Sequence, residues 1–310
     1  MVRVRVPATS ANMGPGFDSL GIAFKLYNEY EFSLEKEGII FEGIEDKYKN
    51  EDNIILMAIK KVFNKYDFKF NGIRIKIIKQ DIPISRGLGS SSSCIIAGLM
   101  GAFALMNKNI DKNEILSLAV DIEGHPDNVC PAIFGGLVST IMADNKPIYN
   151  KVKVYSGVEF AALIPAFELS TEEARAVLPK EINLKDCVYN IGRASLLISC
   201  FVNGNYKLLR EATSDRLHER YRSKLIDNYE LIRNKAFELG ALGCFLSGAG
   251  PTIMGIEKGA LYQLVKERYH LYDDFEFIDN FNNFLNKNYL KWNIKELTID
   301  EDGAKILKGD

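Results

Sequence analysis

Polar and apolar positions alternate along several stretches of the chain, and this period of two predicts half-buried strands. Three valines alternate with two arginines over residues 2–6, and three isoleucines alternate with charged residues over 73–77. Apolar residues over 22–32 predict a further strand. We expect residues 7–21 to form a loop, because glycine, proline, serine and asparagine are frequent there.

Spacings of three to four residues between apolar positions predict helices. An amphipathic helix is expected over residues 53–66, and a second helix, which runs to about Met106, has an almost wholly apolar surface that predicts burial. The second half of the chain repeats the mixture. We expect strands at 157–164, 242–247 and 252–257, and helices at about 172–178, 186–202, 225–239 and from about 260.

A further helix has recognisable signals at both ends. Asp111 and Glu114 form a D-x-x-E capping box at its start. We expect the helix to end near Glu123, because Gly124 can adopt the left-handed conformation and Pro126 follows it.

The mixed order of strands and helices predicts an α+β or α/β architecture. A chain of 310 residues is about right for two domains. The polar segment 144–153, which contains Pro147, predicts a boundary between a domain of residues 1–150 and a domain of residues 151–310.

The composition is that of an ordinary globular protein, with 47% hydrophobic and 26% charged residues. The formal net charge of -2 gives no basic excess, so nucleic acid is not expected as a partner. The N-terminus lacks a signal-peptide pattern, and no apolar run approaches the roughly 20 residues of a membrane span, which predicts no membrane partner and a cytoplasmic location. The five cysteines are scattered, which favours reduced thiols over disulfides or a zinc site.

Glycine and serine residues directly precede the apolar helix. Glycines let a backbone approach an anion closely, and a helix N-terminus attracts negative charge. The segment lacks the lysine of a Walker A loop and the third glycine of a dinucleotide fingerprint, and a flexible turn is the alternative interpretation. We predict an anion-binding segment, called the phosphate loop below, formed by Pro83, Ile84, Ser85, Arg86, Gly87, Leu88, Gly89, Ser90, Ser91, Ser92 and Ser93.

An acidic cluster follows the third predicted helix. Glu123 lies at the helix C-terminus, where a carboxylate opposes the negative end of the dipole, and this placement indicates a counter-cation such as Mg²⁺. His125 and Asp127 are expected to project from a tight turn. A solvated polar turn is an equally good interpretation of this segment alone.

Two more loops display polar groups or glycines. Residues 8–18 present Asn12 and Asp18, an amide and an acid that suit an amino-acid substrate, although the segment can also be a simple strand connection. Residues 247–252 form a second glycine loop, which is either a tight turn or a support for the phosphate loop.

Arginine side chains in the second half are candidate ligands for a carboxylate, which the planar guanidinium grips in two places. Thr171 and Arg175 lie four residues apart and share one face of a predicted helix. Arg220 and Arg222 are close together in the sequence. Any single arginine is more often a surface ion-pair partner than a ligand.

Taken together, the motifs resemble the GHMP kinase superfamily, and within it the homoserine kinases, over essentially the whole chain. The segment PATSANMGPGFD at 7–18 resembles the first homoserine kinase motif, and LSGAGPT at 246–252 resembles the third motif of the superfamily. The phosphate loop and EGHPDNVCPAIFGG at 123–136 are also similar to family motifs. The first motif is specific to homoserine kinases, whereas the phosphate loop fits mevalonate, galactose and related kinases equally.

This resemblance implies a two-domain α+β fold, with an N-terminal domain like one of a small-subunit ribosomal protein and a ferredoxin-like C-terminal domain. ATP and substrate would meet in the cleft between the domains. Ser91 and Glu123 would hold Mg²⁺, the phosphate loop would surround the triphosphate, and Asn53 would lie near the adenosine. The substrate pocket would contain Asn12, Asp18, His125, Asp127, Thr171, Arg175 and Arg222, with Arg220 and Arg222 competing for one role.

The implied reaction is ATP-dependent phosphorylation of the L-homoserine hydroxyl, a step toward threonine. Asp127 would act as general base or only orient the hydroxyl, while Ser91 and Glu123 serve catalysis through the metal ion. The alternatives are another GHMP-type kinase, acting on mevalonate or a sugar, and a non-catalytic ligand- or RNA-binding relative. Hydrolase motifs of the G-x-S-x-G and H-E-x-x-H types are missing. The oligomeric state stays open, with a homodimer as one option.

Overall fold

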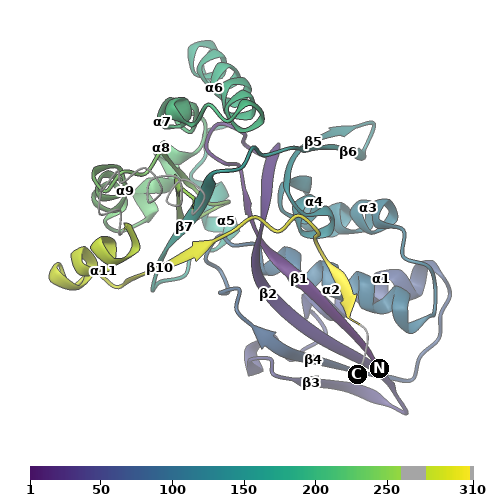
Figure 1. Cartoon of the computed structure of the whole chain (residues 1–310). Helices are drawn as coiled ribbons and strands as arrows, with labels where there is room; N and C mark the ends of the chain where they lie inside the picture. Colours follow the sequence, from purple (N-terminus) through teal and green to yellow (C-terminus); the bar gives the residue numbers. More distant parts are fainter. Residues whose placement is uncertain (260–276, 308–310) are drawn as a thin grey trace.

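A computed structural model describes residues 1–259 and 277–307, which form two β-sheets with helices packed against them (Figure 1). The helix predicted from about residue 260 lies outside these described residues. The first sheet has the order β11-β1-β2-β4-β3, and β5 and β6 extend it from β2. Its strands are β1 (Val2–Ala11), β2 (Leu20–Glu35), β3 (Gly38–Glu42), β4 (Gly72–Gln80), β5 (Leu137–Ala143), β6 (Lys146–Val152) and β11 (Lys305–Leu307).

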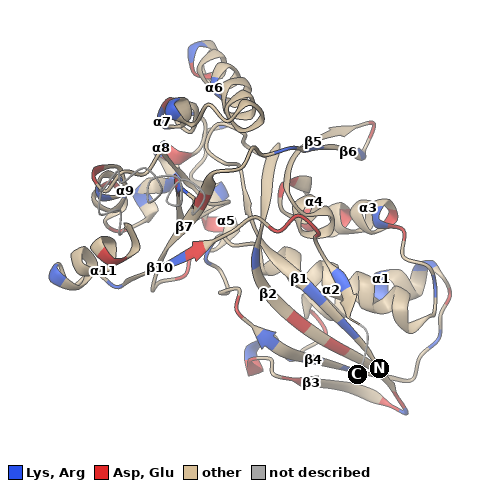
Figure 2. Ribbon diagram, in the orientation of Figure 1, with Lys and Arg blue, Asp and Glu red and all other residues tan. Residues whose placement is uncertain are grey.

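Helices of the first half cover one face of this sheet and bury its alternating apolar positions. Val4 and Val6 of β1 and Phe32 of β2 lie in one core cluster with Ile59 and Leu99 of the helices. On the strands, charges of opposite sign face each other, as between Arg3 on β1 and Glu31 on β2 at 2.8 Å, and Figure 2 shows this blue and red pairing. The helices are α1 (Ile54–Lys65), α2 (Ser90–Leu105), α3 (Lys112–Glu123) and α4 (Pro126–Phe134).

The second sheet is antiparallel, with the order β10-β7-β9-β8. Its strands are β7 (Val158–Pro165), β8 (Gly243–Leu246), β9 (Ile253–Lys258) and β10 (Trp292–Leu297). The helices of this half are α5 (Thr171–Ala176), α6 (Leu184–Asn203), α7 (Leu209–Ala212), α8 (Glu219–Arg222), α9 (Tyr229–Glu238) and α11 (Phe277–Lys287), with short 3-10 turns η2 (Tyr206–Leu208) and η3 (Ser223–Leu225). A third 3-10 turn, η1 (Asp46–Tyr48), lies in the first half, before α1.

The two sheets share a hydrophobic core. Phe24 of β2 packs edge-on against Phe160 of β7 with ring centroids 5.0 Å apart. The chain also returns from the second sheet to the first through residues 298–304, where Ala23 O accepts from the Asp300 amide at 2.9 Å. The predicted division at residue 150 stays a prediction, and β11 belongs to the first sheet although it lies in the second half of the chain.

The polar segment 144–153, which led to the predicted boundary, contains the turn of the β5–β6 hairpin, at Asp144 and Asn145 with φ of 49° and 59°, and strand β6. Two local predictions are wrong, each for an identifiable physical reason. The loop expected at 7–21 is shorter, because the small residues up to Ala11 continue β1 and are fully buried. The turn expected after Gly124 is the start of α4, because Pro126 occupies the first helical turn, where no amide donor is needed.

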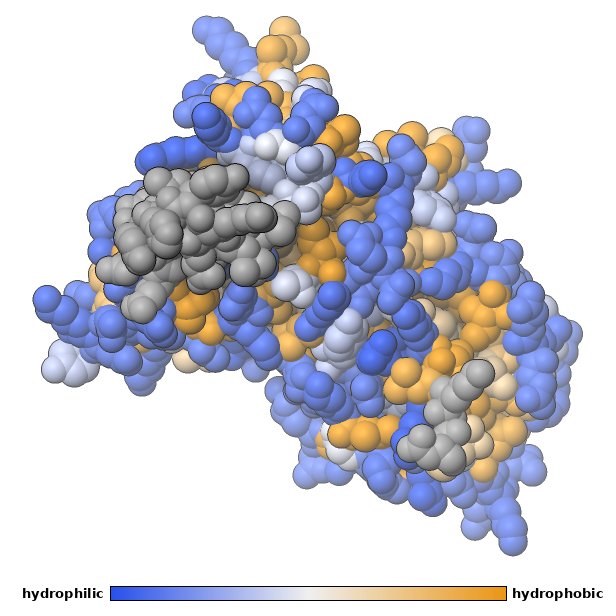
Figure 3. All heavy atoms as spheres, in the orientation of Figure 1, coloured by the Kyte–Doolittle hydropathy of each residue, from blue (hydrophilic) through white to orange (hydrophobic). Residues whose placement is uncertain are grey.

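The predicted helices at 53–66 and 111–123 are confirmed to within one residue at each end, and the apolar helix ends one residue before the expected Met106. It begins at Ser90 rather than after Ser93, so the serines expected in the loop form the first turn of α2. Within residues 1–259 and 277–307, no helix combines the length and the apolar character needed to cross a membrane. On the face shown in Figure 3, hydrophilic side chains cover most of the surface and apolar residues form patches among them.

Candidate active site

The phosphate loop is fixed in place by contacts that only glycine permits. Gly89, at the N-cap of α2, has φ of 73°, and a Cβ there would lie 2.0 Å from Thr9 Oγ1 on β1. Leu88 O accepts from the Thr9 amide at 3.2 Å. This docking on β1 points the first turn of α2, with its amides that lack intrahelical partners, at the space in front of the loop.

The second glycine loop supports the phosphate loop directly. Ser247 Oγ donates to Gly87 O at 2.6 Å, and a Cβ on Gly87 would lie 2.4 Å from Ser247 O. Gly248 also donates its amide to Ala11 O at 3.1 Å, at the end of β1. Of the two sequence interpretations of this segment, the structure favours the support.

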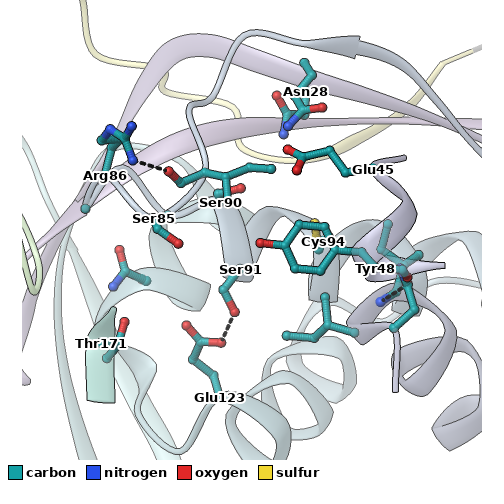
Figure 4. Close-up of a pocket in the computed structure, with 18 of the residues that line it drawn as sticks. Asn28, Glu45, Tyr48, Ser85, Arg86, Ser90, Ser91, Cys94, Glu123 and Thr171 are labelled. Carbon is teal, nitrogen blue, oxygen red and sulfur yellow. Dashed lines mark hydrogen bonds between the residues drawn. The ribbon is translucent and has the colours of Figure 1, made fainter. Parts of the chain in front are cut away.

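A cavity of about 480 Å³ opens in front of the phosphate loop. This volume lies within the range of small-molecule sites. The nucleotide cavity, as we call it, is lined by both halves of the chain, including Tyr48, Asn53, Gly87, Ser91, Glu123, Thr171 and Ala249. Figure 4 shows Ser85, Ser90, Ser91, Glu123 and Thr171 around this space.

Glu123 and two serines form an oxygen-rich group at the N-terminus of α2. Ser91 Oγ donates to Glu123 Oε2 at 2.9 Å, a bond visible in Figure 4, and Ser92 Oγ donates to Oε1 at 3.1 Å. The carboxylate that ends α3 thus faces the positive N-terminus of α2, which offsets its unfavourable position on its own helix. Hydroxyl and carboxylate oxygens are hard ligands that suit Mg²⁺.

Arg86, the single cation of the phosphate loop, directs its guanidinium at backbone carbonyl oxygens of the protein. Its guanidinium donates to Pro165 O at 3.1 Å, Ile84 O at 3.2 Å and Ala166 O at 2.7 Å. These bonds fasten the loop to the end of β7. The guanidinium is thus engaged by the protein, and the place of Arg86 in a nucleotide site stays a prediction.

Asn53 lies at the far end of the cavity and caps α1. Its Oδ1 accepts from the amides of Ile55 at 3.0 Å and Leu56 at 3.2 Å, and its Nδ2 donates to Tyr48 O at 2.8 Å. Both ends of the amide are thus engaged in holding the backbone around the cavity. The side chain shapes the predicted adenosine end rather than offering it a free polar group.

Residues from distant segments meet in a second cluster, called the substrate cluster here. The ligand atoms of Asp18, His125 and Asp127 lie within 4.8 Å of one another. Arg175 on α5 donates to both carboxylate oxygens of Asp18, at 2.9 and 3.3 Å. His125 Nδ1 lies 2.5 Å from Asp127 Oδ1. Four of the predicted substrate residues are therefore neighbours.

The pKa of His125 is raised above its ordinary value of 6.5. Burial alone lowers this pKa, but the hydrogen bond and negative charge of Asp127, together with the charge of Glu123, outweigh the effect of burial. The imidazole therefore holds its proton to higher pH than a free histidine. A protonated His125 adds positive charge to the cluster that it forms with Asp18 and Asp127.

Asn12 and Arg222 connect the substrate cluster to the nucleotide cavity. Asn12 Nδ2 donates to Gly248 O at 2.8 Å, and its Oδ1 accepts from the Asp18 amide at 2.9 Å. Arg222 Nη1 donates to the same Gly248 O at 3.1 Å. Both ends of the Asn12 amide thus hold the protein backbone, and a direct contact of Asn12 with the substrate stays a prediction.

Arg220 and Arg222, the two candidates for one place in the predicted substrate pocket, have different surroundings. Arg220 is exposed and pairs with Asp186 at 2.9 Å. Arg222 is 1% exposed, and its pKa is lowered to about 10 by burial first and then by the charge of Arg175. The charges of Asp18 and Asp127 act on this pKa in the opposite direction, and the Arg222 guanidinium lies over Phe17 together with that of Arg175. This proximity favours Arg222 over Arg220 as the predicted substrate arginine.

Some site residues had no signal in the sequence. Tyr48 follows an irregular polar segment, and only the fold brings it against the cavity. The guanidinium groups of Arg222 and Arg175 both lie over the Phe17 ring. Their Cζ atoms are 5.2 and 5.8 Å from the ring centroid of Phe17. The motif around Phe17 was recognised, but the aromatic contact depends on residues 158 or more positions away.

Comparisons with known proteins agree with this geometry. The sequence profile of the GHMP kinases N terminal domain matches residues 53–136, and that of the GHMP kinases C terminal domain matches residues 197–267. A homoserine kinase of Clostridium botulinum (strain Alaska E43 / Type E3) is 52% identical over 311 residues and 100% of both chains. A homoserine kinase of Clostridium beijerinckii is 52% identical over 100% of this chain and 99% of the relative.

A solved structure shows that the fold, too, is similar to that of a homoserine kinase. The crystal structure of homoserine kinase from Cytophaga hutchinsonii superposes with a TM-score of 0.83 at 25% identity, covering 99% of this chain and 97% of that one. The chain belongs to the GHMP kinases, which use ATP as the phosphoryl donor, and has their two-domain α+β fold. Within that superfamily it belongs to the homoserine kinase family.

Proposed function

We propose that this enzyme transfers the γ-phosphoryl group of ATP to the side-chain hydroxyl of L-homoserine, giving ADP and O-phospho-L-homoserine. The observation that carries the substrate assignment is the Asp18–Arg175 pair beside Asp127. An α-amino acid carries an ammonium and a carboxylate on one carbon, and this pair presents the complementary charges. Mevalonate and sugars have no ammonium group for Asp18.

The site residues divide the work as follows. Asp18 binds the ammonium, and Arg175, supported by the buried charge of Arg222, binds the carboxylate. Asp127, held by His125, lies where a substrate hydroxyl can donate to it. It orients the hydroxyl, and proximity to the nucleotide supplies much of the rate because phosphoryl transfer has a loose transition state.

The nucleotide would lie in the cavity with its triphosphate against the phosphate loop. Amides at the N-terminus of α2 favour phosphate oxygens there. Ser91 and Glu123 would hold Mg²⁺, which offsets the negative charge of the triphosphate when bound. This contribution matters more because the guanidinium of Arg86 is engaged by carbonyl oxygens.

The test is ADP formation by the purified protein with ATP and Mg²⁺. L-homoserine should support turnover, while mevalonate, galactose, L-serine and L-threonine should support at most a small fraction of it. Faster turnover with mevalonate or a sugar would refute the substrate assignment, and absence of ATP binding would favour a non-catalytic relative. A cytoplasmic location and a homodimer stay predictions from the sequence.

A further inference from the structure

His218 is completely buried directly behind the substrate cluster, between α8 and the loop of residues 12–18, which we call the substrate loop. Both of its ring nitrogens have partners. Nε2 lies 2.9 Å from Gly14 O in the substrate loop, and Nδ1 lies 3.3 Å from Arg222 Nη1. One imidazole thus touches both Arg222, the predicted substrate arginine, and the loop that carries Asp18.

These two partners determine where the proton of the ring lies. A carbonyl oxygen only accepts, so Nε2 must carry hydrogen to bond Gly14 O. A guanidinium only donates, so Nδ1 must be bare to accept from Arg222. Both bonds exist together only in the neutral ring with hydrogen on Nε2. A second proton, on Nδ1, would place an N–H donor of the ring opposite an N–H donor of Arg222.

The surroundings favour that neutral form. The pKa of His218 is lowered, chiefly by burial and also by the positive charge of Arg222, although Asp215 raises it. The ring also stacks on Phe17, with centroids 5.2 Å apart and planes at 29°. Phe17 in turn lies under the guanidinium groups of Arg222 and Arg175. The imidazole is therefore held on its edge and on its face.

A neighbouring contact holds the same loop from the same side. Asn190 Nδ2 lies 3.3 Å from Pro15 O and 2.6 Å from Asp215 Oδ1. Asp215 accepts from the His218 amide at 2.8 Å. Two consecutive carbonyls of the substrate loop are thus fastened by side chains of the second half of the chain.

We propose that His218 is a positioning residue for the amino-acid substrate: a neutral imidazole that aims Arg222 and fixes the substrate loop, so that the ammonium and carboxylate sites keep their spacing. This inference rests on the proposed function. His218 itself does not touch the reacting atoms. Its effect should therefore be on substrate affinity more than on nucleotide affinity.

The experiment compares three substitutions in the full chain. His218→Phe keeps the ring and its stacking but has neither nitrogen. His218→Asn places an acceptor near the position of Nδ1, and His218→Gln places a donor near the position of Nε2. Phe281→Leu, at a buried position of α11, is the control for a loss of stability away from the site.

The expected result is a split between the two substrates. Loss of a hydrogen bond to a charged group predicts that His218→Phe raises the homoserine KM about tenfold or more, with the ATP KM within about twofold of wild type. His218→Asn should recover more affinity than His218→Gln, because it keeps the bond to Arg222. In an Arg222→Ala background the Phe substitution should have much less effect, since the two residues act as a unit.

Several outcomes would overturn the proposal. Equal increases in both KM values, or a lower melting temperature with an unchanged homoserine KM as in the Phe281→Leu control, would leave His218 a purely structural residue. If His218→Phe does not fold, better binding by the Gln variant than by the Asn variant would be decisive against it. A wild-type enzyme without homoserine-dependent ADP formation would instead refute the proposed function.

Discussion

Replacing Arg175 with alanine tests the substrate assignment most directly. Without substrate, Arg175 donates two bonds to Asp18, and the two side chains are 39% and 35% exposed. An ion pair this exposed is worth about 0.2–1 kcal/mol. A charged hydrogen bond to the substrate carboxylate is worth about 1.5–3 kcal/mol. Substrate binding thus exchanges a weak internal pair for a stronger contact.

The variant loses the stronger contact but is also spared the cost of opening the pair. The net loss of binding free energy, which is the substrate contact minus the ion pair, is about 1.5–2 kcal/mol. This loss corresponds to a roughly 10- to 30-fold increase in the homoserine KM. The assay is steady-state ADP production, with homoserine and ATP varied separately. KM reports affinity here only if chemistry is slower than substrate release, so single-turnover rates accompany it.

Arg220→Ala is the matched control, because Arg220 lies two residues from Arg222 yet its exposed side chain pairs with Asp186, away from the substrate cluster. Its homoserine KM should stay within about twofold of wild type, because this pair contributes nothing to the proposed substrate contacts. An unchanged homoserine KM in Arg175→Ala, together with a raised ATP KM, would refute the role of Arg175. Equal effects of both arginine substitutions would refute the geometric argument for the cluster.

Three further predictions concern other groups. Asp127→Asn should lower kcat by about 10²-fold or more with little change in the ATP KM, and an unchanged kcat would remove Asp127 from the chemistry. Glu123→Gln should raise the Mg²⁺ concentration needed for half-maximal activity, and a Mg²⁺ titration with the same midpoint as wild type would contradict this. The pKa of Glu219 is raised from 4.5 to about 8, by burial first and then by Asp215, so unfolding releases a proton between these values and the free energy of unfolding falls as pH rises through that window. Glu219→Gln should flatten this decline in denaturant melts at pH 5 and 8, and an equally steep decline would assign it to another group.

Some parts of the fold were predictable because their signals are local. The helix at Ser90–Leu105 is apolar on all sides, and burial on all sides is the result. Gly124 ends α3 with φ of 90°, as its sequence position indicates. Motif residues such as Ser91 and Glu123 could be paired because the phosphate loop and the acidic cluster both have recognisable patterns.

Other features depend on contacts that no local pattern encodes. Arg86 was predicted as part of the phosphate loop, but no local pattern indicated that carbonyl oxygens at the end of β7, about 80 residues away, would accept from its guanidinium. His218 gave no sequence signal, since its partners Gly14 and Arg222 come together only in the folded chain. The pairing of β11 with β1 likewise joins residues about 300 positions apart.

That last pairing means that the second sheet lies, in chain order, between two strands of the first sheet, β6 and β11. A fragment cut at residue 150 would leave β1 as an edge strand, because β11 covers it at Arg3, Val4 and Arg5. Exposed edges of this kind promote association between chains. A better isolated first lobe would splice residues 1–152 to 298–307. The start of β1 lies beside the end of β11, because Arg3 pairs with Leu307 (Figure 1). A circular permutant in which a linker connects the end of β11 to the start of β1 would therefore keep both sheets intact.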